Sequence, residues 1–283
     1  MCNYGKIIGY SNMFLLKLRK KRLYMSAFIN TAIKAAYFAA NVIQNSSRSL
    51  TKIKVIQKNK NDFVSDIDKK AEEEIIKTIK KTYPSHNILA EESGFIDNKS
   101  DFTWIIDPID GTTNFIHGHP NYSISIALKE KNKIIHGVIL DPNRNDLYQA
   151  SIGKGSLLND KRIRVSNNNL EHSLIATGFP SVDLTIIDKY LQIFKDITLN
   201  TTGQRRLGSA ALDLAYVASG IVDGFYEYNL KTWDVAAGIL LVKEAGGIVV
   251  NFNGDSHLGD DGSIIAANPK IVNQLQKIIK KHL

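Results

Sequence analysis

The sequence is poor in cysteine, with Cys2 alone among 283 residues. One cysteine cannot form an internal disulfide or supply a cysteine-rich metal site, so a reducing cytoplasm is the expected compartment. Prolines number only six, and no proline-, glycine- or serine-rich tract divides the chain. Because 43% of the residues are hydrophobic, the chain can bury a sizeable core, either as one large domain or as two small ones.

The sequence also lacks a membrane-length apolar run. Its longest apolar stretch, residues 26–43, is interrupted by Asn30, Lys34 and Asn41. It therefore falls short of the ~20 apolar residues that a bilayer requires. The apolar patch at residues 13–16 precedes the basic cluster, which is the reverse of the order in a secretory signal. We expect neither a transmembrane helix nor a signal peptide.

The net charge of +8 is unevenly distributed. Residues 1–24 contain six basic residues and no acidic one, so the remainder of the chain is nearly balanced. Global basicity is consequently a weak argument for nucleic-acid binding. Residues 1–24 are predicted to be a disordered basic extension, or to lie upstream of a true start at Met25. Residues 25–283 are expected to form one continuous unit.

Hydrophobic periodicity predicts an alternation of helices and strands. Apolar residues recur at helical spacing from Ile29 to Ile43, and a second helix begins near Ser65 and stops at Tyr83-Pro84. Further strands and helices follow. The predicted strands are 87–90, 103–106, 123–128 and 133–140 (the last two as a hairpin), 148–150, 174–177, 222–226, 248–252 and 264–267, and the predicted helices are 186–194, 209–218, 234–244 and 270–280. This mixture indicates an α+β or layered α/β fold.

Two carboxylates directly follow the strand at residues 103–106. Asp107 and Asp110 are separated by Pro108 and Ile109, and Gly111 comes next. Proline fixes φ and removes an N–H group, so a sharp turn can aim both acids into one cleft. Carboxylates beside hydroxyl and N–H groups suit Mg²⁺ and a phosphate. The tetrapeptide alone also fits an ordinary surface turn.

A third acid opens an apolar helix. Asp234 follows Trp233 at the start of a helix so apolar that it must be deeply buried. The simplest role for Asp234 is an N-cap, which contributes about 1 kcal/mol. A carboxylate at the mouth of a buried helix is also well placed to enter a central cleft.

These segments resemble the inositol monophosphatase family. Residues 104–115 (Trp-Ile-Ile-Asp-Pro-Ile-Asp-Gly-Thr-Thr-Asn-Phe) resemble its first signature, and residues 233–247 resemble its second. The acidic pair in Ala90-Glu91-Glu92-Ser93 is similar to the family's intervening metal motif. Residues 203–216 look most like the bacterial SuhB branch. The resemblance runs from about Met25 to the C-terminus.

The resemblance implies a fold, a reaction and a set of roles. The implied fold is a layered αβαβα sandwich, assembled as a homodimer, and the implied reaction is Mg²⁺-dependent, lithium-sensitive hydrolysis of inositol monophosphate or a similar small polyol phosphate. Thr112 is implied to orient the attacking water, with Asp68 as its acidic partner. Two or three Mg²⁺ ions per site are implied, with Asp107 bridging two of them. The implied metal ligands are Glu91, Asp107, the carbonyl of Ile109, Asp110 and Asp234, and Glu91 counts with Thr112 and Asp68 as catalytic.

Substrate contacts are implied in the same way. The backbone N–H groups of Gly111 and Thr112 are expected to bind the phosphate, and Glu227 the substrate hydroxyls. The segment Gly208, Ser209 and Ala210 is expected to lie alongside. An alternative is a bisphosphate phosphatase of the same superfamily, acting on a nucleotide 3'(2'),5'-bisphosphate or fructose 1,6-bisphosphate. Glu227 disfavours that alternative mildly, because a carboxylate repels a second phosphate.

A further alternative belongs to a different functional class. SuhB-like proteins are associated with transcription complexes and ribosomal RNA maturation, so catalysis could be secondary. Arg205 and Arg206 are the candidate contacts for such a partner, although intrachain or dimer ion pairs are the simpler explanation for them. The histidines His117, His119 and His136 match no zinc spacing and are expected to be structural or solvated. Glu92 is expected to support the site without binding metal.

Overall fold

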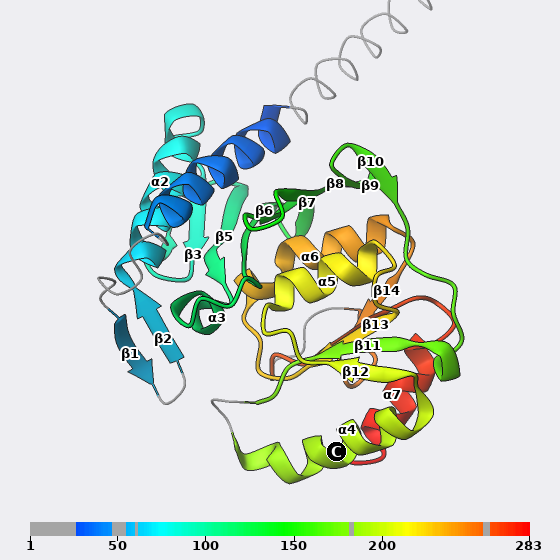
Figure 1. The fold of residues 1–283 in the computed structure, drawn as a ribbon. Helices are drawn as coiled ribbons and strands as arrows, with labels where there is room; N and C mark the ends of the chain where they lie inside the picture. The colour runs from blue at the N-terminus through cyan, green and yellow to red at the C-terminus, as the bar shows by residue number, and fades with distance from the viewer. Residues whose placement is uncertain (1–26, 47–54, 60–61, 181–183, 257–260) are drawn as a thin grey trace, which may run out of the picture.

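Helices and strands alternate along the chain, as the sequence predicts (Figure 1). The structure, a computed structural model, describes residues 27–46, 55–59, 62–180, 184–256 and 261–283. The predicted extension at residues 1–24 lies outside these ranges. In the part of the chain that the structure describes, no helix is both long and apolar enough to cross a membrane.

Each predicted helix overlaps a helix of the structure. Residues 27–46 form the first helix. The others are α2 (Asp66–Thr82), α3 (Thr112–Ile116), α4 (Ile187–Asn200), α5 (Ala210–Ala218), α6 (Thr232–Glu244) and α7 (Val272–Lys280), with short 3₁₀ turns η2 (Leu170–His172) and η3 (Leu184–Ile186). The helix α3 was not predicted, and α4 continues beyond the predicted residue 194.

The residues that the structure describes include the strands β1 to β15. They are β1 (Val55–Asn59), β2 (Asp62–Ser65), β3 (Asn87–Ala90), β4 (Gly94–Ile96), β5 (Phe102–Asp110), β6 (Ser123–Glu130), β7 (Lys133–Asp141), β8 (Asp146–Ser151), β9 (Gly155–Leu158), β10 (Lys161–Ile163), β11 (Leu174–Thr177), β12 (Gly203–Arg205), β13 (Gly224–Glu227), β14 (Ile248–Val250) and β15 (Ile264–Ala267). β1 and β2 pair only with each other.

The other strands form two mixed sheets. An eight-stranded sheet has the order β10-β9-β8-β7-β6-β5-β3-β4, and a five-stranded sheet has the order β12-β11-β13-β15-β14. The predicted hairpin is confirmed, since β6 pairs antiparallel with β7. β3 runs parallel to β5, with Ala90 opposite Ile106, so both strands end at the same edge of the larger sheet.

The sheets and helices stack in five layers, which confirms the predicted sandwich. In Figure 1 the first helix and α2 cover one face of the larger sheet, α5 and α6 lie between the two sheets, and α4 and α7 cover the far side of the smaller sheet. The side-chain period of two explains this arrangement, because successive residues of a strand enter different cores. Trp104 and Ile106 pack under the first helix and α2, whereas Ile105 packs against α5 and α6.

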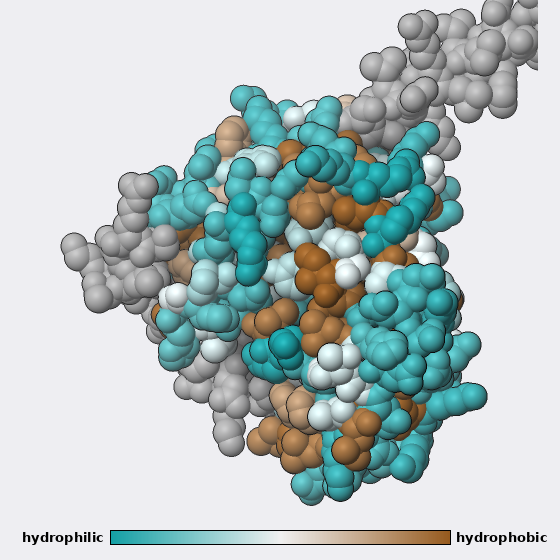
Figure 2. All heavy atoms as spheres, turned by 45° about the vertical axis from the view of Figure 1, so that its right-hand side comes forward, coloured by the Kyte–Doolittle hydropathy of each residue, from teal (hydrophilic) through white to brown (hydrophobic). Residues whose placement is uncertain are grey.

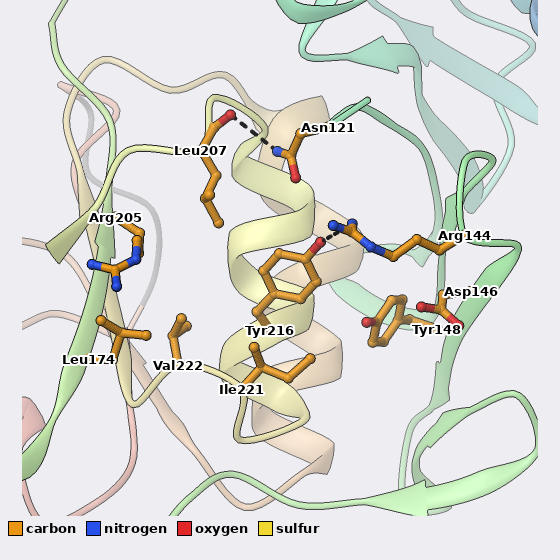
Figure 3. A pocket seen from close by; sticks show the side chains of 10 residues that line it. All are labelled: Asn121, Arg144, Asp146, Tyr148, Leu174, Arg205, Leu207, Tyr216, Ile221 and Val222. Carbon is orange, nitrogen blue, oxygen red and sulfur yellow. Dashed lines mark hydrogen bonds between the residues drawn. The ribbon is translucent and has the colours of Figure 1, made fainter. Parts of the chain in front are cut away.

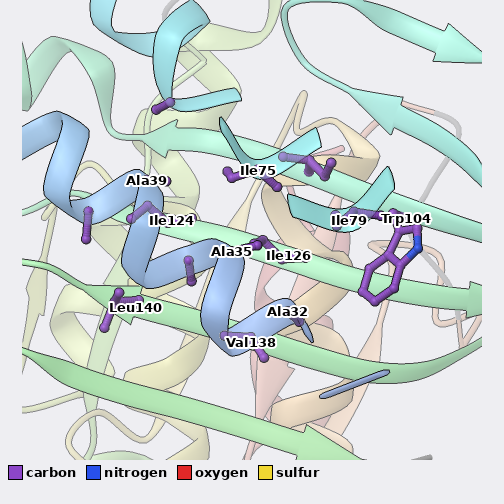
Figure 4. Close-up of a cluster of buried hydrophobic side chains, with 14 of the residues drawn as sticks. Ala32, Ala35, Ala39, Ile75, Ile79, Trp104, Ile124, Ile126, Val138 and Leu140 are labelled. Atoms are coloured by element: carbon purple, nitrogen blue, oxygen red, sulfur yellow. The ribbon is translucent and has the colours of Figure 1, made fainter. Parts of the chain in front are cut away.

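Small side chains let the first helix approach the sheet closely. Figure 4 shows its alanines lying over the strands, and the residues drawn there are buried. Alanine favours helix and leaves room for branched strand residues. The labelled members are Ala32, Ala35, Ala39, Ile75, Ile79, Trp104, Ile124, Ile126, Val138 and Leu140.

The central helices are apolar on nearly every side because a sheet lies on each side of them. Every residue of α5 is buried. Gly238 of α6 faces α5, where a Cβ at this position would lie 2.5 Å from the Cβ of Leu214. Such close packing leaves few polar groups in this layer, and those present lie at the ends of α5 and α6 or, as with Asp213, inside α5.

Candidate active site

β5 carries the two central carboxylates on a bulge. The sequence predicted a strand that ends at Ile106, but β5 continues to Asp110. Its register against β6 shifts between Asp107, opposite Ser125, and Asp110, opposite Ser123, so β5 has one extra residue there. Pro108 fits because a bulge tolerates a missing N–H. Residues three apart normally face opposite sides of a sheet, and the extra residue brings Asp107 and Asp110 to the same side.

A left-handed glycine directs the chain from β5 into α3. Gly111 has φ +95°, and a Cβ there would lie 3.0 Å from the Gly208 carbonyl oxygen. The turn places the Oγ1 atom of Thr112 3.0 Å from Asp68 Oδ1 and 2.9 Å from the Ile109 carbonyl oxygen. The predicted pairing of Thr112 with Asp68 is therefore present. The single hydroxyl proton can serve one of the two acceptors at a time.

The N-terminus of α5 holds Asp110. Ser209, the N-cap residue, donates its hydroxyl to Asp110 Oδ2 at 2.5 Å, and the Ala211 N–H donates to the same oxygen at 2.8 Å. A helix N-terminus favours negative charge there. Ser209 was predicted to line the substrate, but its hydroxyl here binds a predicted metal ligand. Its side chain therefore acts first on Asp110.

Asp234 lies in the first turn of α6. An N-cap was the simplest role expected for Asp234, but the cap is Lys231, and Asp234 Oδ2 accepts the Lys231 N–H at 2.7 Å. The helix begins two residues earlier than expected, and the Asp234 carboxylate satisfies the N–H group of the cap residue. The shift leaves Asp234 on the first turn of the central helix, beside Asp110.

Glu91 enters the site from the end of β3. Its backbone N–H donates to the Ile106 carbonyl at 3.2 Å, which continues the parallel pairing of β3 with β5. Glu91 and Asp107 interact electrostatically. Residues from β3, β5, α2 and α6 thus converge where the sequence predicted a single site.

The carboxylates of this cluster repel one another. Burial raises the pKa of Asp107 well above its usual value, and the nearby Glu91, Asp110, Asp234 and Asp68 raise it further. Burial raises the pKa of Asp110 to about 6, against the opposing hydrogen bonds from Ser209 and Ala211. Burial, followed by Asp110, raises the pKa of Asp234 to about 8. Carboxylates gathered in this way need protons or a cation to compensate them.

The donor set fits a hard cation such as Mg²⁺. Carboxylate and carbonyl oxygens are the donors that Mg²⁺ prefers, and the crowded negative charge would be relieved by it. Within the described ranges, no group of three or more His, Cys, Asp or Glu side chains is already arranged as a metal cluster.

Glu227 occupies a space that only glycine leaves open. It ends β13, and a Cβ at Gly178 would overlap its carboxylate, with 2.0 Å to Cδ. Burial raises the pKa of Glu227 to about 8, while the charge of Arg206 opposes the shift and that of Asp110 adds to it. Glu227 therefore lies within electrostatic reach of both the carboxylate cluster and Arg206.

The two arginines have different surroundings. Arg206 lies over Gly208, where a Cβ would meet its Nη1 atom at 2.5 Å, and it acts on Glu227 and Asp213. An intrachain electrostatic role is thus supported for Arg206. Both arginines are exposed, and the Arg205 Nη1 atom donates to the Gln204 carbonyl at 2.9 Å.

Arg205 lines a pocket of about 340 Å³ that contains none of the predicted metal ligands (Figure 3). Its wall combines apolar, aromatic and charged side chains, including Ile221, which is 55% exposed. Figure 2 shows apolar side chains gathered in the middle of one face between hydrophilic ones. The lining residues are Asn121, Arg144, Asp146, Tyr148, Leu174, Arg205, Leu207, Tyr216, Ile221 and Val222.

Sequence reasoning missed two buried acids that lie close to predicted site residues. Asp213 lies in α5, and its Oδ1 atom has no hydrogen-bond partner among the described residues. Burial raises its pKa well above the usual value, as do Glu227 and Asp110. The sequence feature that could have revealed Asp213 is the presence of an acid within the apolar run from Ala211 to Ala215. Glu72 lies on α2, four residues after Asp68, and its signal was that helical spacing.

The structure places His136 in the core and His117 at the end of α3. His136 is 1% exposed, and its Nδ1 atom lies 2.8 Å from Ser151 Oγ. Burial lowers its pKa to about 4, which fits a neutral core residue. His117 lies immediately after α3 as its C-cap residue.

Comparisons with known proteins agree across the chain. The model of the inositol monophosphatase family matches residues 25–282. Nus factor SuhB of Pseudomonas aeruginosa is 45% identical over 265 residues, covering 92% of this chain and 98% of that protein. The extragenic suppressor protein SuhB of Bartonella henselae superposes with a TM-score of 0.88 at 41% identity, covering 91% of this chain and 100% of the other. The inositol monophosphatase of Anabaena (Nostoc) sp. superposes with a TM-score of 0.78 at 34% identity, covering 92% of this chain and 98% of the other.

Proposed function

The chain belongs to the inositol monophosphatase family, and from this premise we propose that it is a Mg²⁺-dependent phosphatase of a small polyol monophosphate such as inositol monophosphate. Family membership supports a phosphatase. The observation that carries the finer proposal is Asp107, which is 2% exposed and surrounded by four other carboxylates. A buried cluster of this kind costs stability unless it is used to bind a cation.

The residues that would hold Mg²⁺ are the ones already described. Glu91, Asp107 and the Ile109 carbonyl would hold one ion, and Asp107, Asp110 and Asp234 would hold a second. Two or three Mg²⁺ ions per site are proposed. Bound Mg²⁺ would neutralise the phosphate and the ester oxygen and acidify a water molecule. Ser209 and Ala211 hold Asp110 through its Oδ2 atom, which fixes the direction of its carboxylate.

Thr112 is proposed to orient the attacking water. When its Oγ1 proton is donated to Asp68, the remaining lone pairs of Oγ1 can accept a hydrogen bond from water. Asp68 is 0% exposed, so this hydrogen bond is shielded from solvent. The N–H groups of Gly111 and Thr112 are proposed to bind the phosphate oxygens. Such positioning contributes through orientation of the reacting groups and through stabilisation of developing charge.

Glu227 is proposed to recognise the polyol. A carboxyl group with a pKa of about 8 carries its proton most of the time at neutral pH, so it can both donate to and accept from sugar hydroxyls. Gly208 and Ala210 lie at the start of α5 beside this region. One observation favours the bisphosphate alternative, because Arg206 lies near Glu227 and would attract a second phosphate.

The test is phosphate release across a substrate panel, with and without Mg²⁺. Inositol monophosphates and glycerol phosphates represent the proposed class, and fructose 1,6-bisphosphate and adenosine bisphosphates represent the alternative. We expect kcat/KM to be greatest for a polyol monophosphate. A preference of more than tenfold for a bisphosphate would reject the proposed class. Equal release in excess chelator would reject metal dependence.

A second proposed role is contact with transcription machinery, in keeping with the name of the Pseudomonas aeruginosa relative. The supporting observation is exposed Arg205 in a pocket apart from the carboxylates. Arg205→Ala should weaken capture of transcription proteins from a cell lysate while turnover stays within a few-fold. Asp107→Asn should lose turnover while it still captures the same transcription proteins as the wild type. An Arg205→Ala variant that captures every partner of the wild type would reject this role for Arg205.

A further inference from the structure

α2 buries two carboxylates on one face, one helical turn apart. Asp68 is 0% exposed and Glu72 is 3% exposed, whereas the adjacent Glu73 is exposed. Residues four apart lie above one another on a helix, so both acids face the same side. Asp68 is accounted for by its hydrogen bond with Thr112. Glu72 has no role in the function proposed above, and burying a carboxylate is costly unless its oxygens are hydrogen-bonded.

Glu72 holds the loop that follows Glu91. Its Oε2 atom accepts the Glu92 N–H at 2.8 Å, and its Oε1 atom accepts the Ser93 N–H at 2.9 Å. Each carboxylate oxygen thus binds a separate backbone donor of consecutive residues. Hydrogen bonds to an ionised carboxylate are shorter and stronger than neutral ones. The loop is consequently tied to α2 by two charge-assisted bonds.

The residue between these anchors is Glu91. On one side its own N–H is bonded to the Ile106 carbonyl of β5 at 3.2 Å. On the other side the next two N–H groups are bonded to Glu72. The backbone on both sides of Glu91 is therefore fixed, to β5 and to α2. Because β5 also carries Asp107, this arrangement sets the position of one carboxylate relative to the other.

We propose that Glu72 is a positioning residue that holds Glu91 in place for the cation shared with Asp107. This inference rests on the proposed function in one respect, the assignment of Glu91 as a cation ligand. α2 would then control both halves of the site, with Asp68 aligning Thr112 and Glu72 aligning Glu91. A small movement of α2 would disturb both together.

The primary variant is Glu72→Gln, which keeps the length of the side chain and one acceptor oxygen. Its NH₂ group would face an N–H donor of the loop, so one of the two anchors is lost. Loss of such an outer partner typically lowers metal affinity about 10- to 100-fold, and we expect a change of that size for Mg²⁺ measured by calorimetry on the metal-free protein. Glu72→Ala should lose at least as much. Glu73→Gln is the matched control, with the same change at the adjacent exposed position.

A second readout distinguishes positioning from general stability. Amide hydrogen exchange at Glu92 and Ser93 should accelerate in Glu72→Gln, while that of the sheet core, such as Ile106, should not. Steady-state kinetics should show a higher Mg²⁺ concentration for half-maximal rate with KM for substrate within about threefold at saturating Mg²⁺. Global destabilisation alone would accelerate exchange throughout the core and leave Mg²⁺ affinity of the folded protein unchanged.

The outcomes separate this inference from the proposed function. Wild-type protein that binds no Mg²⁺ would reject both. Wild-type protein that binds Mg²⁺ would retain the function, and Glu72→Gln with wild-type Mg²⁺ affinity would then reject the positioning role alone. Should the variants fail to fold, exchange in the wild type still decides, since unprotected Glu92 and Ser93 amides would contradict the anchors. Protected amides together with a specific loss of Mg²⁺ affinity would support the role.

Discussion

Replacing Asp107 by asparagine should stabilise the metal-free protein while abolishing turnover. The Asp107 side chain is 2% exposed, and four other carboxylates add to the burial that raises its pKa. Asparagine retains the Oδ1 acceptor, which takes the Ile109 N–H at 3.0 Å. The substitution therefore keeps the local bond and removes a crowded negative charge.

The magnitude follows from the repulsion that is removed. Two unit charges about 5 Å apart repel by about 3 kcal/mol at an effective dielectric constant of about 20. The neighbouring acids are partly protonated at neutral pH, so the net gain in the free energy of unfolding should be about 1–3 kcal/mol. For a domain of this size the melting temperature should rise by about 3–10 °C. Turnover should fall at least about 100-fold, since a bridging cation ligand contributes several kcal/mol to transition-state stabilisation.

The assay combines thermal melts with phosphate release. Both proteins are melted at pH 8 after chelation and again with excess Mg²⁺. Mg²⁺ should raise the melting temperature of the wild type and have little effect on Asp107→Asn. Asp188→Asn is the control, because it makes the same change at an exposed position of α4. A metal-free Asp107→Asn protein that melts below the wild type, or that retains turnover within tenfold, would refute the reasoning.

Four further predictions follow from the same structure. The pKa values of Asp234 and Glu227 are raised to about 8, so the folded state holds protons that the unfolded state releases. The stability of the metal-free protein should therefore fall as pH rises from about 4.5 to about 8. Melting temperatures that stay constant across this range would contradict the prediction. Gly178→Ala should displace Glu227 and raise KM for a polyol phosphate about 10- to 100-fold, measured by steady-state kinetics. Deletion of residues 1–24 should leave turnover and melting temperature nearly unchanged, and a large drop in either would show a structural role. Ca²⁺ and Li⁺ should inhibit Mg²⁺-dependent phosphate release, and a rate insensitive to both would reject that expectation.

Much of the fold was predictable because the spacing of apolar residues indicates where most helices and strands lie. The β6–β7 hairpin and the helices α2 and α5 follow from apolar spacing and their stop signals. The five-layer stacking came from the family resemblance, not from periodicity. The structure explains it through alternate residues such as Ile105 and Ile106, which enter different cores.

The sequence reading placed the ends of two elements wrongly. β5 was predicted to end at Ile106, but pairing with β6 carries it through a bulge, and this pairing has no local signature. The helix α6 was predicted to begin at Asp234, but it begins two residues earlier, with Lys231 as its cap. The bond from the Lys231 N–H to Asp234 joins residues three apart, which is the spacing of a capping box.

The site was predictable in its principal acids but not in their supports. Asp107, Asp110 and Asp234 stand at element ends where the sequence marks them. Glu72 acts on backbone groups 20 and 21 residues away, so no short motif connects it to the site. Asp213 is visible only as an acid in an apolar run, and its proximity to Glu227 depends on how α5 packs beside β13.

The most direct test of the central claim is phosphate release from inositol 1-phosphate by chelated, dialysed protein as Mg²⁺ is added back. Without metal, we expect no release above background, and a saturable rate should return as Mg²⁺ is added. Asp107→Asn should stay inactive at every Mg²⁺ concentration. Equal release with and without Mg²⁺, or full activity of Asp107→Asn, would contradict this claim.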